Sequence, residues 1–322
     1  MTIAFNLIPI DLRTPGTYIE VDNSQAVRGL SILAPRVLII GQKIAAGTAT
    51  VNTMRQISDI AAVDALFGRG SQLAAMCRAF RAANTTSDLW AMAVSDNGAG
   101  VAATGTIAFA GTATAAGTQP VYVGGRRART AVTNAMTAAA LATAVAAAIN
   151  ADLDAPVTAS AATGTVTLTA RHKGLCGNDI DIRTAYYSDD AQPAGITATV
   201  TAMATGAANP DMAAALTAIG DEWVTDIVVP WNDAANLTLL QDDLVSRFGP
   251  LRMIDCRAWR GVSGAHATLV AAGATFAGHQ RQGRGEQRAG AGASHQPEHA
   301  AKQKGATEGA AVEPAGCRIG AG

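Results

Sequence analysis

The sequence is poor in charged and aromatic side chains. Among its 322 residues, charged residues make up 15% and aromatic residues 4%, and the formal net charge at pH 7 is −1. Proteins that bind nucleic acid or anionic membranes usually carry an excess of basic residues, so the totals give no electrostatic footprint for either partner. So few charges favour a protein whose surface is covered by partners, although a GC-rich gene would produce the same composition.

The signatures of several common functional sites are also missing. The four cysteines form no CxxC pair, and no GxxxxGK[ST] phosphate-binding loop occurs. No signal peptide is expected, because the N-terminus has no basic start and no unbroken apolar stretch. The longest apolar run, 135–149, is mostly alanine and falls short of the ~18 strongly apolar residues of a membrane span. The sequence therefore predicts a soluble protein.

One glycine-rich turn resembles the start of a dinucleotide-binding fingerprint. In Gly68-Arg69-Gly70-Ser71 the first two glycines have the right spacing, but Leu73 stands where the third is needed. The turn also follows a helix pattern, whereas the fingerprint must follow a strand. We therefore expect a turn in which Ser71 caps the next helix, and no cofactor is predicted.

Two further groupings are weak candidates for a metal site and a catalytic triad. His295 and His299 have a zinc-like spacing but lack a companion cysteine pair. Asp255, Ser263 and His266 have the residue types of a hydrolase triad, but Ser263 is not set in a GxSxG elbow. The sequence thus predicts no metal site, no catalytic residue and no enzyme activity.

One dense basic cluster, Arg126-Arg127-Ala128-Arg129, lies outside the C-terminal tail. It has no aromatic residues interleaved with it, so direct nucleic-acid binding is not predicted, and a solvated approach to a helix or a subunit contact is expected. The four tryptophans lie in or beside the segments 24–97 and 209–277, which have an α/β pattern, and are expected in the core. They are Trp90, Trp223, Trp231 and Trp259.

The fold class predicted is α/β, with a mostly parallel sheet formed by residues 24–97 and 209–277. Continuous apolar runs at 37–40 and 89–94 are typical of strands buried on both faces, and further strands are expected at 224–229 and 251–256. Helix patterns alternate with them. Ser58 is expected to cap a short helix that ends near Phe67, and Ser71 is expected to cap the next helix. Asn209-Pro210 is expected to begin a later helix, which ends at Gly220.

Residues 98–208 have a different pattern. Glycine-rich turns separate short strands that alternate apolar residues with threonine, expected around 107–109, 121–123, 166–168, 180–182 and 198–200. An alanine-rich helix places Leu141, Val145 and Ile149 on one face. This pattern predicts an inserted, mainly antiparallel β domain with one helix. In contrast, residues 278–322 contain only Val312 and Ile319 as large aliphatics, so a disordered low-complexity tail is expected there.

Residues 1–23 are predicted to form an extended N-terminal arm. Pro9 and Pro15 rule out a helix, whereas residues 18–22 alternate in a way that suits a strand. Such an arm can complete the sheet edge of a neighbouring subunit, and folding back over its own domain is equally compatible with the chemistry. The candidate inter-subunit residues are Tyr18, Ile19, Glu20, Val21, Asp22 and Asn23.

Four stretches, in this order and spacing, resemble the tail sheath proteins of contractile-tailed bacteriophages of the Mu-like group. They are residues 13–26, 67–74 and 173–183, and residues 226–230 together with the helix at 237–247. The resemblance covers the chain from its start to about Gly273. Members of this family usually continue beyond the helix at 265–272 with more sheath domain and a C-terminal arm, so a truncated or altered C-terminus is expected.

The resemblance implies a structural virion subunit that stacks in rings as a helical homo-polymer around the tail tube. Contraction of the sheath would drive the tube through the host envelope for genome ejection. Its implied partners are other copies of itself, the tail tube protein, the baseplate and the tail terminator, with no direct nucleic acid and no small-molecule substrate. The implied location is the virion tail, after assembly in the host cytoplasm.

Three alternatives remain open at this stage. The same assembly physics would serve the sheath of a phage-derived bacteriocin or injection system. An α/β enzyme whose active loops carry no recognised motif would show a cluster of titratable groups at the strand ends. A surface adhesin would suit the threonine-rich segment but conflicts with the missing signal peptide.

Overall fold

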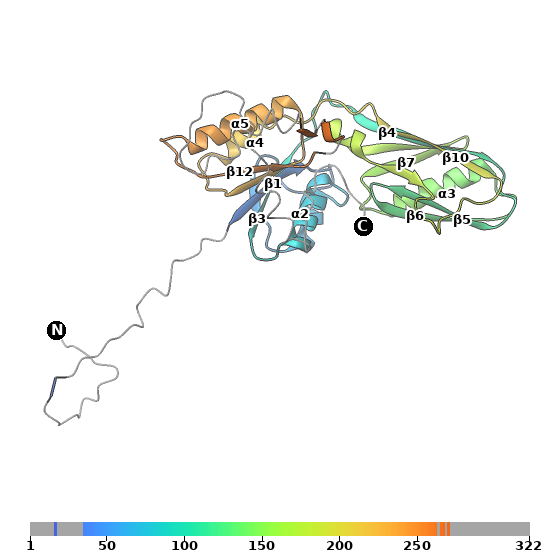
Figure 1. Cartoon of the computed structure of the whole chain (residues 1–322), viewed down its shortest axis with the longest axis horizontal. Helices are drawn as coiled ribbons and strands as arrows, with labels where there is room; N and C mark the ends of the chain where they lie inside the picture. Colours follow the sequence, from blue (N-terminus) through green and yellow to red (C-terminus); the bar gives the residue numbers. More distant parts are fainter. Residues whose placement is uncertain (1–15, 18–34, 263–264, 268, 271–322) are drawn as a thin grey trace. The chain divides into compact units, whose positions relative to one another are not determined.

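The computed structural model describes residues 16–17, 35–262, 265–267 and 269–270 (Figure 1). The chain divides into two compact units, residues 1–34 and 35–322, and the architecture below is that of the second. The predicted arm and tail lie outside the described residues, except for Gly16 and Thr17.

A five-stranded sheet is built from chain segments on both sides of residues 98–208. Its order is β12-β11-β1-β3-β2. β1 (Arg36–Gln42) pairs in parallel with β11 (Asp226–Val229) and with β3 (Asp88–Val94), and β11 pairs in parallel with β12 (Arg257–Arg260). Only the edge strand β2 (Met54–Gln56) runs antiparallel to its neighbour. The expected strands at 37–40 and 89–94 are therefore the centre of a mostly parallel sheet.

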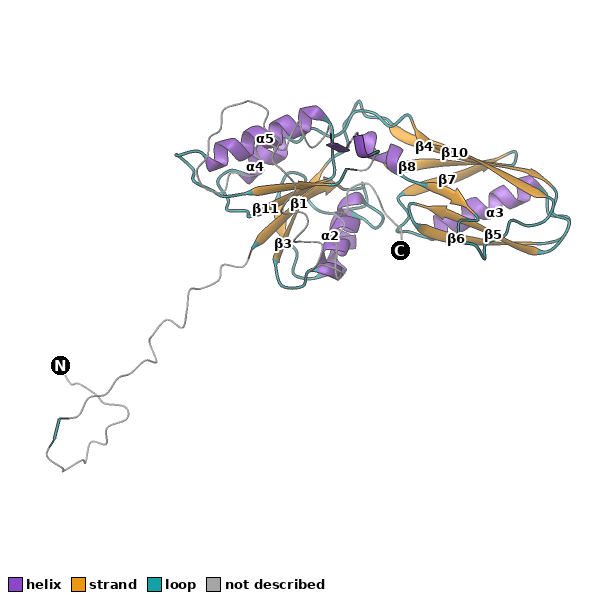
Figure 2. Ribbon diagram, viewed as in Figure 1, coloured by secondary structure: helices purple, strands orange, loops and turns teal. Residues whose placement is uncertain are grey.

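Helices cover both faces of this sheet (Figure 2). Ile39 faces a core that includes α1 (Val63–Phe67) and α2 (Gln72–Ala83). Leu38 and Ile40 face the opposite core, with α4 (Ala213–Ile219) and α5 (Ala234–Phe248). Successive residues of a strand point to opposite faces, so a strand between two helix layers buries every side chain. This explains the unbroken aliphatic run of β1.

Two antiparallel sheets and one long helix make up the segment between β3 and α4. The four-stranded sheet has the order β10-β4-β8-β7, and the three-stranded sheet has the order β6-β5-β9. One core joins both sheets to α3 (Ala138–Ala151), whose buried side includes Leu141, Val145 and Ile149 as expected. The strands are β4 (Ala102–Gly111), β5 (Gly117–Val123), β6 (Arg126–Val132), β7 (Val157–Ala162), β8 (Thr165–Lys173), β9 (Ile182–Thr184) and β10 (Ile196–Ala204).

Three local predictions are wrong. Residues 251–256 are not a strand, because a turn follows Gly249-Pro250 and Met253 has φ +52°; the strand β12 begins at Arg257. The short helix after β2 begins as the 3-10 turn η1 (Ile60–Ala62), capped by Asp59 and not by Ser58. Asn209 caps no helix, since its side-chain oxygen accepts the N–H of Leu175 and α4 begins only at Ala213.

The mixed α/β class is confirmed, with several sheets in one unit. Ser71 caps α2 by accepting the N–H of Ala74, and Gly220 ends α4 with φ +53°, as expected. The division into a domain formed by residues 24–97 and 209–277 and an inserted domain at 98–208 remains a prediction.

Candidate functional site between the sheets

Polar side chains meet where the central strands β1 and β3 end. Gln42 is the last residue of β1, and Asp96 lies two residues beyond β3. The Gln42 side-chain N–H2 donates to Asp96 Oδ1 (2.8 Å) and to the backbone carbonyl of Lys173 (2.7 Å). Because Lys173 ends β8, these bonds tie the parallel sheet to the four-stranded antiparallel sheet.

His172 completes this polar contact. The N–H of Gln72, the first residue of α2, donates to His172 Nε2 (2.9 Å), and His172 Nδ1 lies 3.3 Å from Asp96 Oδ1. An Nε2 that accepts a hydrogen bond leaves the proton on Nδ1, where it can be donated to Asp96. The imidazole therefore bridges a helix N-terminus and a carboxylate.

The environment of Asp96 keeps its carboxylate ionised. Burial raises the pKa of Asp96, but the hydrogen bonds from His172, the Lys173 N–H and Gln42 outweigh it, so the net pKa lies below the ordinary value. A general base needs a pKa nearer the working pH. The three donors therefore fit a structural carboxylate and not a proton acceptor in catalysis.

A second polar contact is an ion network around Asp154, which lies between α3 and β7. Arg69 donates to both carboxylate oxygens of Asp154 (3.0 and 3.2 Å), and Arg78 of α2 donates to one of them (3.1 Å). Arg126 of β6 donates a hydrogen bond to Asp152, two residues before Asp154 in the chain. The hydrogen bonds from Arg69 are the largest cause of the lowered pKa of Asp154.

The backbones approach each other closely at this network. Gly70 has φ +83°, and a Cβ placed there would lie 2.5 Å from the carbonyl oxygen of Leu153. Glycine tolerates both the positive φ and the short approach. The Gly68-Arg69-Gly70-Ser71 turn thus holds α2 against the antiparallel sheets, which explains its glycines without a phosphate ligand.

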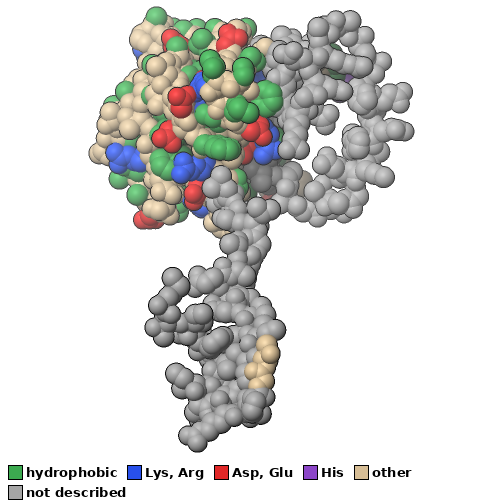
Figure 3. Space-filling view, turned by 90° about the vertical axis from the view of Figure 1, so that its left-hand side faces the viewer, with side chains coloured by type: hydrophobic (Ala, Val, Ile, Leu, Met, Phe, Trp, Pro, Cys, Tyr) green, Lys and Arg blue, Asp and Glu red, His purple; other side chains and the backbone are tan. Residues whose placement is uncertain are grey.

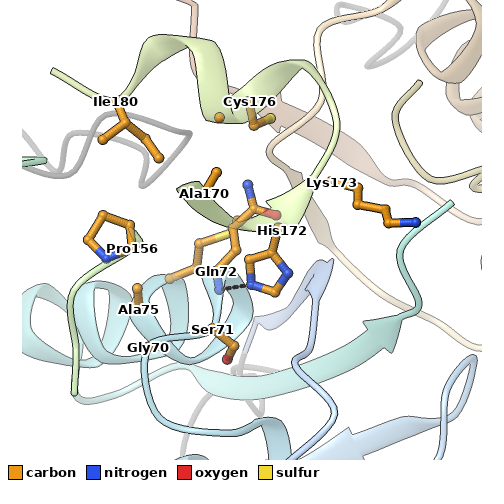
Figure 4. Close-up of a pocket in the computed structure, with 12 residues that line it drawn as sticks. Gly70, Ser71, Gln72, Ala75, Pro156, Ala170, His172, Lys173, Cys176 and Ile180 are labelled. Carbon is orange, nitrogen blue, oxygen red and sulfur yellow. Dashed lines mark hydrogen bonds between the residues drawn. The ribbon is translucent and has the colours of Figure 1, made fainter. Parts of the chain in front are cut away.

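A small cavity lies between the two polar contacts (Figure 4). Its volume is about 60 Å³ and its lining is mostly apolar, with Ala75, Pro156 and Ile180 opposite His172. Pockets for small molecules and cofactors usually measure ~300–1,000 Å³. The cavity has room for at most a few water-sized groups, so the polar groups around it serve a contact between layers.

The candidate catalytic and metal residues are not brought together in the part of the chain that the structure describes. Asp255 is exposed, His266 lies in a helical stretch, and Ser263 lies outside the described residues, as do His295 and His299. Within the described ranges, no group of three or more His, Cys, Asp or Glu could hold a metal ion. The inter-subunit candidates Tyr18 to Asn23 also lie outside these ranges.

The tryptophan prediction is only partly right. Trp231 is fully buried, and Trp90 is half-buried against the core on the α4–α5 side of the sheet. Trp223 and Trp259 are 51% and 52% exposed, which contradicts the expected core position. Trp223 lies in the loop before β11, and Trp259 lies on the edge strand β12, so neither is covered by a second layer.

The basic cluster 126–129 is part of the strand β6, and the next element along the chain is the helix α3, which begins at Ala138. Sequence reasoning missed β6 and β7, and it missed the surroundings of the arginines. Tyr122, Tyr186 and Tyr187 form three edge-to-face ring pairs beside Arg127 and Arg183, with centroids 5.0–6.0 Å apart. Only the adjacent pair Tyr186-Tyr187 in the sequence hinted at this cluster.

No helix in the described part of the chain is long and apolar enough to cross a membrane. The geometry defines a layered protein in which polar side chains connect the sheets to one another.

Over 270 residues, 84% of its length, the chain is 46% identical to the Mu-like prophage FluMu tail sheath protein of Haemophilus influenzae. This confirms the resemblance. The chain belongs to the family of tail sheath proteins of Mu-like phages. It spans 55% of that protein's length. No family model matches the chain.

Two solved structures of sheath tail proteins are also similar. The one from Listeria innocua is 14% identical with a TM-score of 0.29, and covers 72% of this chain and 48% of its own. The one from Desulfitobacterium hafniense is 13% identical, also with a TM-score of 0.29, and covers 76% and 52%. Superpositions with such low scores add no detail to the architecture described above.

Proposed function

We propose that this chain is a structural subunit of a contractile phage tail sheath, which polymerises around the tail tube and contracts to drive the tube through the host envelope for genome ejection. The observation that carries the proposal is the 46% identity over 270 residues to a tail sheath protein. Because the chain spans about half of that relative, the role of the whole relative is carried over only as a proposal.

The proposed partners are other copies of the chain in stacked helical rings, the tail tube protein, the baseplate and the tail terminator. The subunit would assemble in the host cytoplasm and act in the virion tail. The sheath domain would comprise residues 24–97 and 209–277, interrupted by a β-rich module at 98–208. The five-stranded sheet, built from both sides of residues 98–208, supports this division.

The proposed mechanism needs no chemical step. A contractile lattice stores free energy in a metastable packing of subunits and releases it when the interfaces repack. Extended arms keep neighbours attached during this change, because a strand added to a sheet edge is held by a row of main-chain hydrogen bonds. Residues 18–23 are the proposed arm strand.

Deletion of residues 1–23 tests this proposal. We expect a folded protein, with an unchanged circular dichroism spectrum, that no longer forms the polymers of the full chain in negative-stain micrographs. A finer pair of variants is Val21→Pro, which removes a main-chain donor and should stop polymerisation, and Val21→Thr, which keeps a β-branched strand residue and should not. Intact tubes from the deletion variant would contradict the proposed arm.

A further inference from the structure

A group of three tyrosines, one buried and two exposed, lies at the three-stranded sheet. Tyr122 of β5 stands directly opposite Arg127 of β6 on one side and Arg183 of β9 on the other. Tyr186 and Tyr187, 47% and 43% exposed, pack edge-on against Tyr122. The chain has only four tyrosines, so composition alone does not explain three of them in one cluster.

Ion pairs beneath the rings hold this cluster in place. The side chain of Asp190 is 3% exposed, and it accepts hydrogen bonds from the Tyr122 hydroxyl and from Arg127. The guanidinium of Arg183 lies 4.6 Å from the centre of the Tyr186 ring. Side chains that are already fixed lose little entropy on binding. We call Arg127, Arg129, Arg183, Tyr186 and Tyr187 the Tyr–Arg surface.

The chemistry of this surface fits a protein partner better than a nucleic acid. The three strands carry four arginines and no acidic residue, but loop carboxylates neutralise most of them. Arg126 pairs with Asp152, Arg127 with Asp190 and Arg183 with Asp181. A groove for single-stranded nucleic acid needs net positive charge along the backbone path. Exposed tyrosine with arginine is instead the composition enriched at protein interfaces.

A complementary surface exists on the same chain. Residues 211–255 carry eight acidic side chains against two arginines. Asp221 pairs with Arg252 and Glu222 pairs with Arg36, but their side chains remain 83% and 63% exposed. Both adjoin the exposed Trp223. On α5, Asp242 is exposed between Leu239 and Val245, one helical turn away on either side. Figure 3 shows one end of the structure, where hydrophobic side chains lie among both acidic and basic side chains.

We call Asp221, Glu222, Trp223, Leu239, Asp242 and Val245 the α4–α5 surface. We propose that the Tyr–Arg surface of one copy binds the acidic α4–α5 surface of a second copy. Arg129 on the Tyr–Arg surface is exposed and forms no ion pair within the described residues, whereas the α4–α5 surface has an acidic excess. Both surfaces also expose apolar area, and these are the elements of a specific contact. Two different patches on one chain make a head-to-tail contact, and such a contact generates rings or an open helical polymer. This inference deepens the proposed sheath function and rests on it.

Sedimentation velocity of the full chain at low ionic strength tests the contact. We expect concentration-dependent association of the native chain, weakened about tenfold or more by Tyr186→Ala and by Arg129→Glu. Tyr186→Phe keeps the ring and should associate as the native chain does. Val101→Ala alters an exposed apolar residue outside both surfaces and should have no effect. Circular dichroism verifies that each variant is folded.

A charge exchange identifies the partner surface. Asp242→Lys should weaken association as Arg129→Glu does, and the two changes combined in one chain should restore a large part of it, because every contact then pairs the exchanged charges. Native-like association of Tyr186→Ala and Arg129→Glu would overturn the inference, as would the absence of rescue. Binding of a labelled 20-nucleotide thymidine strand that depends on Tyr186 would assign the surface to nucleic acid instead.

The outcomes separate this inference from the proposed function. If tubes never form but association depends on Tyr186 and Arg129, the contact stands and the sheath proposal fails. If Tyr186→Ala and Arg129→Glu form the same tubes as the native chain, the sheath proposal stands and the contact is wrong. A native chain that stays monomeric at every concentration would contradict both.

Discussion

The parallel and the antiparallel sheets bury their strands in different ways. In β1, Leu38, Ile39 and Ile40 alternate between two cores, and all three are at most 1% exposed. In β10, Ile196 and Met203 are buried, whereas the threonines between them are exposed. One sheet is covered by helices on both faces, and the other sheets keep one face in water.

This difference bears on assembly. A sheet between two helix layers can offer a partner only its edges and its helices. Sheets with one open face can offer that whole face, and the Tyr–Arg surface lies on such a face. The two regions also meet through polar groups, at Asp96 and at Asp154, and not through one continuous apolar core. We therefore expect a destabilising substitution in one region to affect mainly the stability of that region.

The largest effect is expected from cavities in the two cores. Leu38→Ala and Leu141→Ala each remove a side chain with 0% exposure and should lower the free energy of unfolding by about 2–5 kcal/mol. Hydrogen exchange should rise mainly in β1, β3 and β11 for Leu38→Ala, and mainly in β4, β7 and β8 for Leu141→Ala. Equal loss of protection everywhere in both variants would show a single cooperative core.

A smaller effect is expected at the contact between the regions. Asp154→Asn leaves Arg69 and Arg78 without their shared carboxylate. The cost should be about 1–2 kcal/mol, because Arg69 is half exposed to water and Arg78 keeps its ion pair with Asp64. Exchange should become faster in the 64–78 and 152–156 segments. Asp181→Asn is the matched control, because its ion pair with Arg183 is more than half exposed on the Asp181 side and should contribute less than about 1 kcal/mol. Equal costs for both variants would mean that the network around Asp154 is only a surface feature.

The loss of stability on removing an N-cap should be smaller still, and should differ between the N-caps of α2 and α3. Ser71→Ala removes the acceptor for the Ala74 N–H at a fully buried N-cap and should cost about 1 kcal/mol in chemical denaturation. Thr137→Ala removes the corresponding cap of α3, which is exposed, so water can replace it and the loss should be smaller. The reverse order would contradict the role given to the turn at Gly70.

The pH dependence is expected to be the smallest effect near neutrality. The pKa values of Asp96, Asp152 and Asp154 lie below their ordinary value in the folded chain, so the unfolded chain binds more protons as the pH falls. Their contribution is fully present above about pH 4 and is lost as the pH falls through the lower, folded pKa values. Denaturant midpoints at pH 7, 5, 4 and 3 measure this loss. Asp96→Asn should flatten the curve, and constant midpoints would contradict the assignment.

The sequence predicted the elements whose signal is local. Continuous aliphatic runs indicated β1 and β3, and the threonine alternation indicated most antiparallel strands. β6 was missed because Arg126, Arg127 and Arg129 suppress the apolar pattern, and its strand conformation depends on pairing with β5. β12 was placed six residues too early because the apolar residues of the 251–256 turn resemble a strand.

The candidate contacts could not be predicted, because their members are far apart in the chain. Gln42 and His172 lie 54 and 76 residues from Asp96, and Asp190 lies 68 residues from Tyr122. No spacing rule for motifs connects such positions. The family resemblance, which depends on short local stretches, was confirmed by comparison, whereas the arm residues Tyr18 to Asn23 remain a prediction.

Negative-stain electron microscopy of the purified, concentrated full chain tests the central claim most directly, because the claim is that this protein acts by assembling. We predict tubes or stacked rings with a regular axial repeat. Single particles of monomer size at every concentration and ionic strength would contradict it.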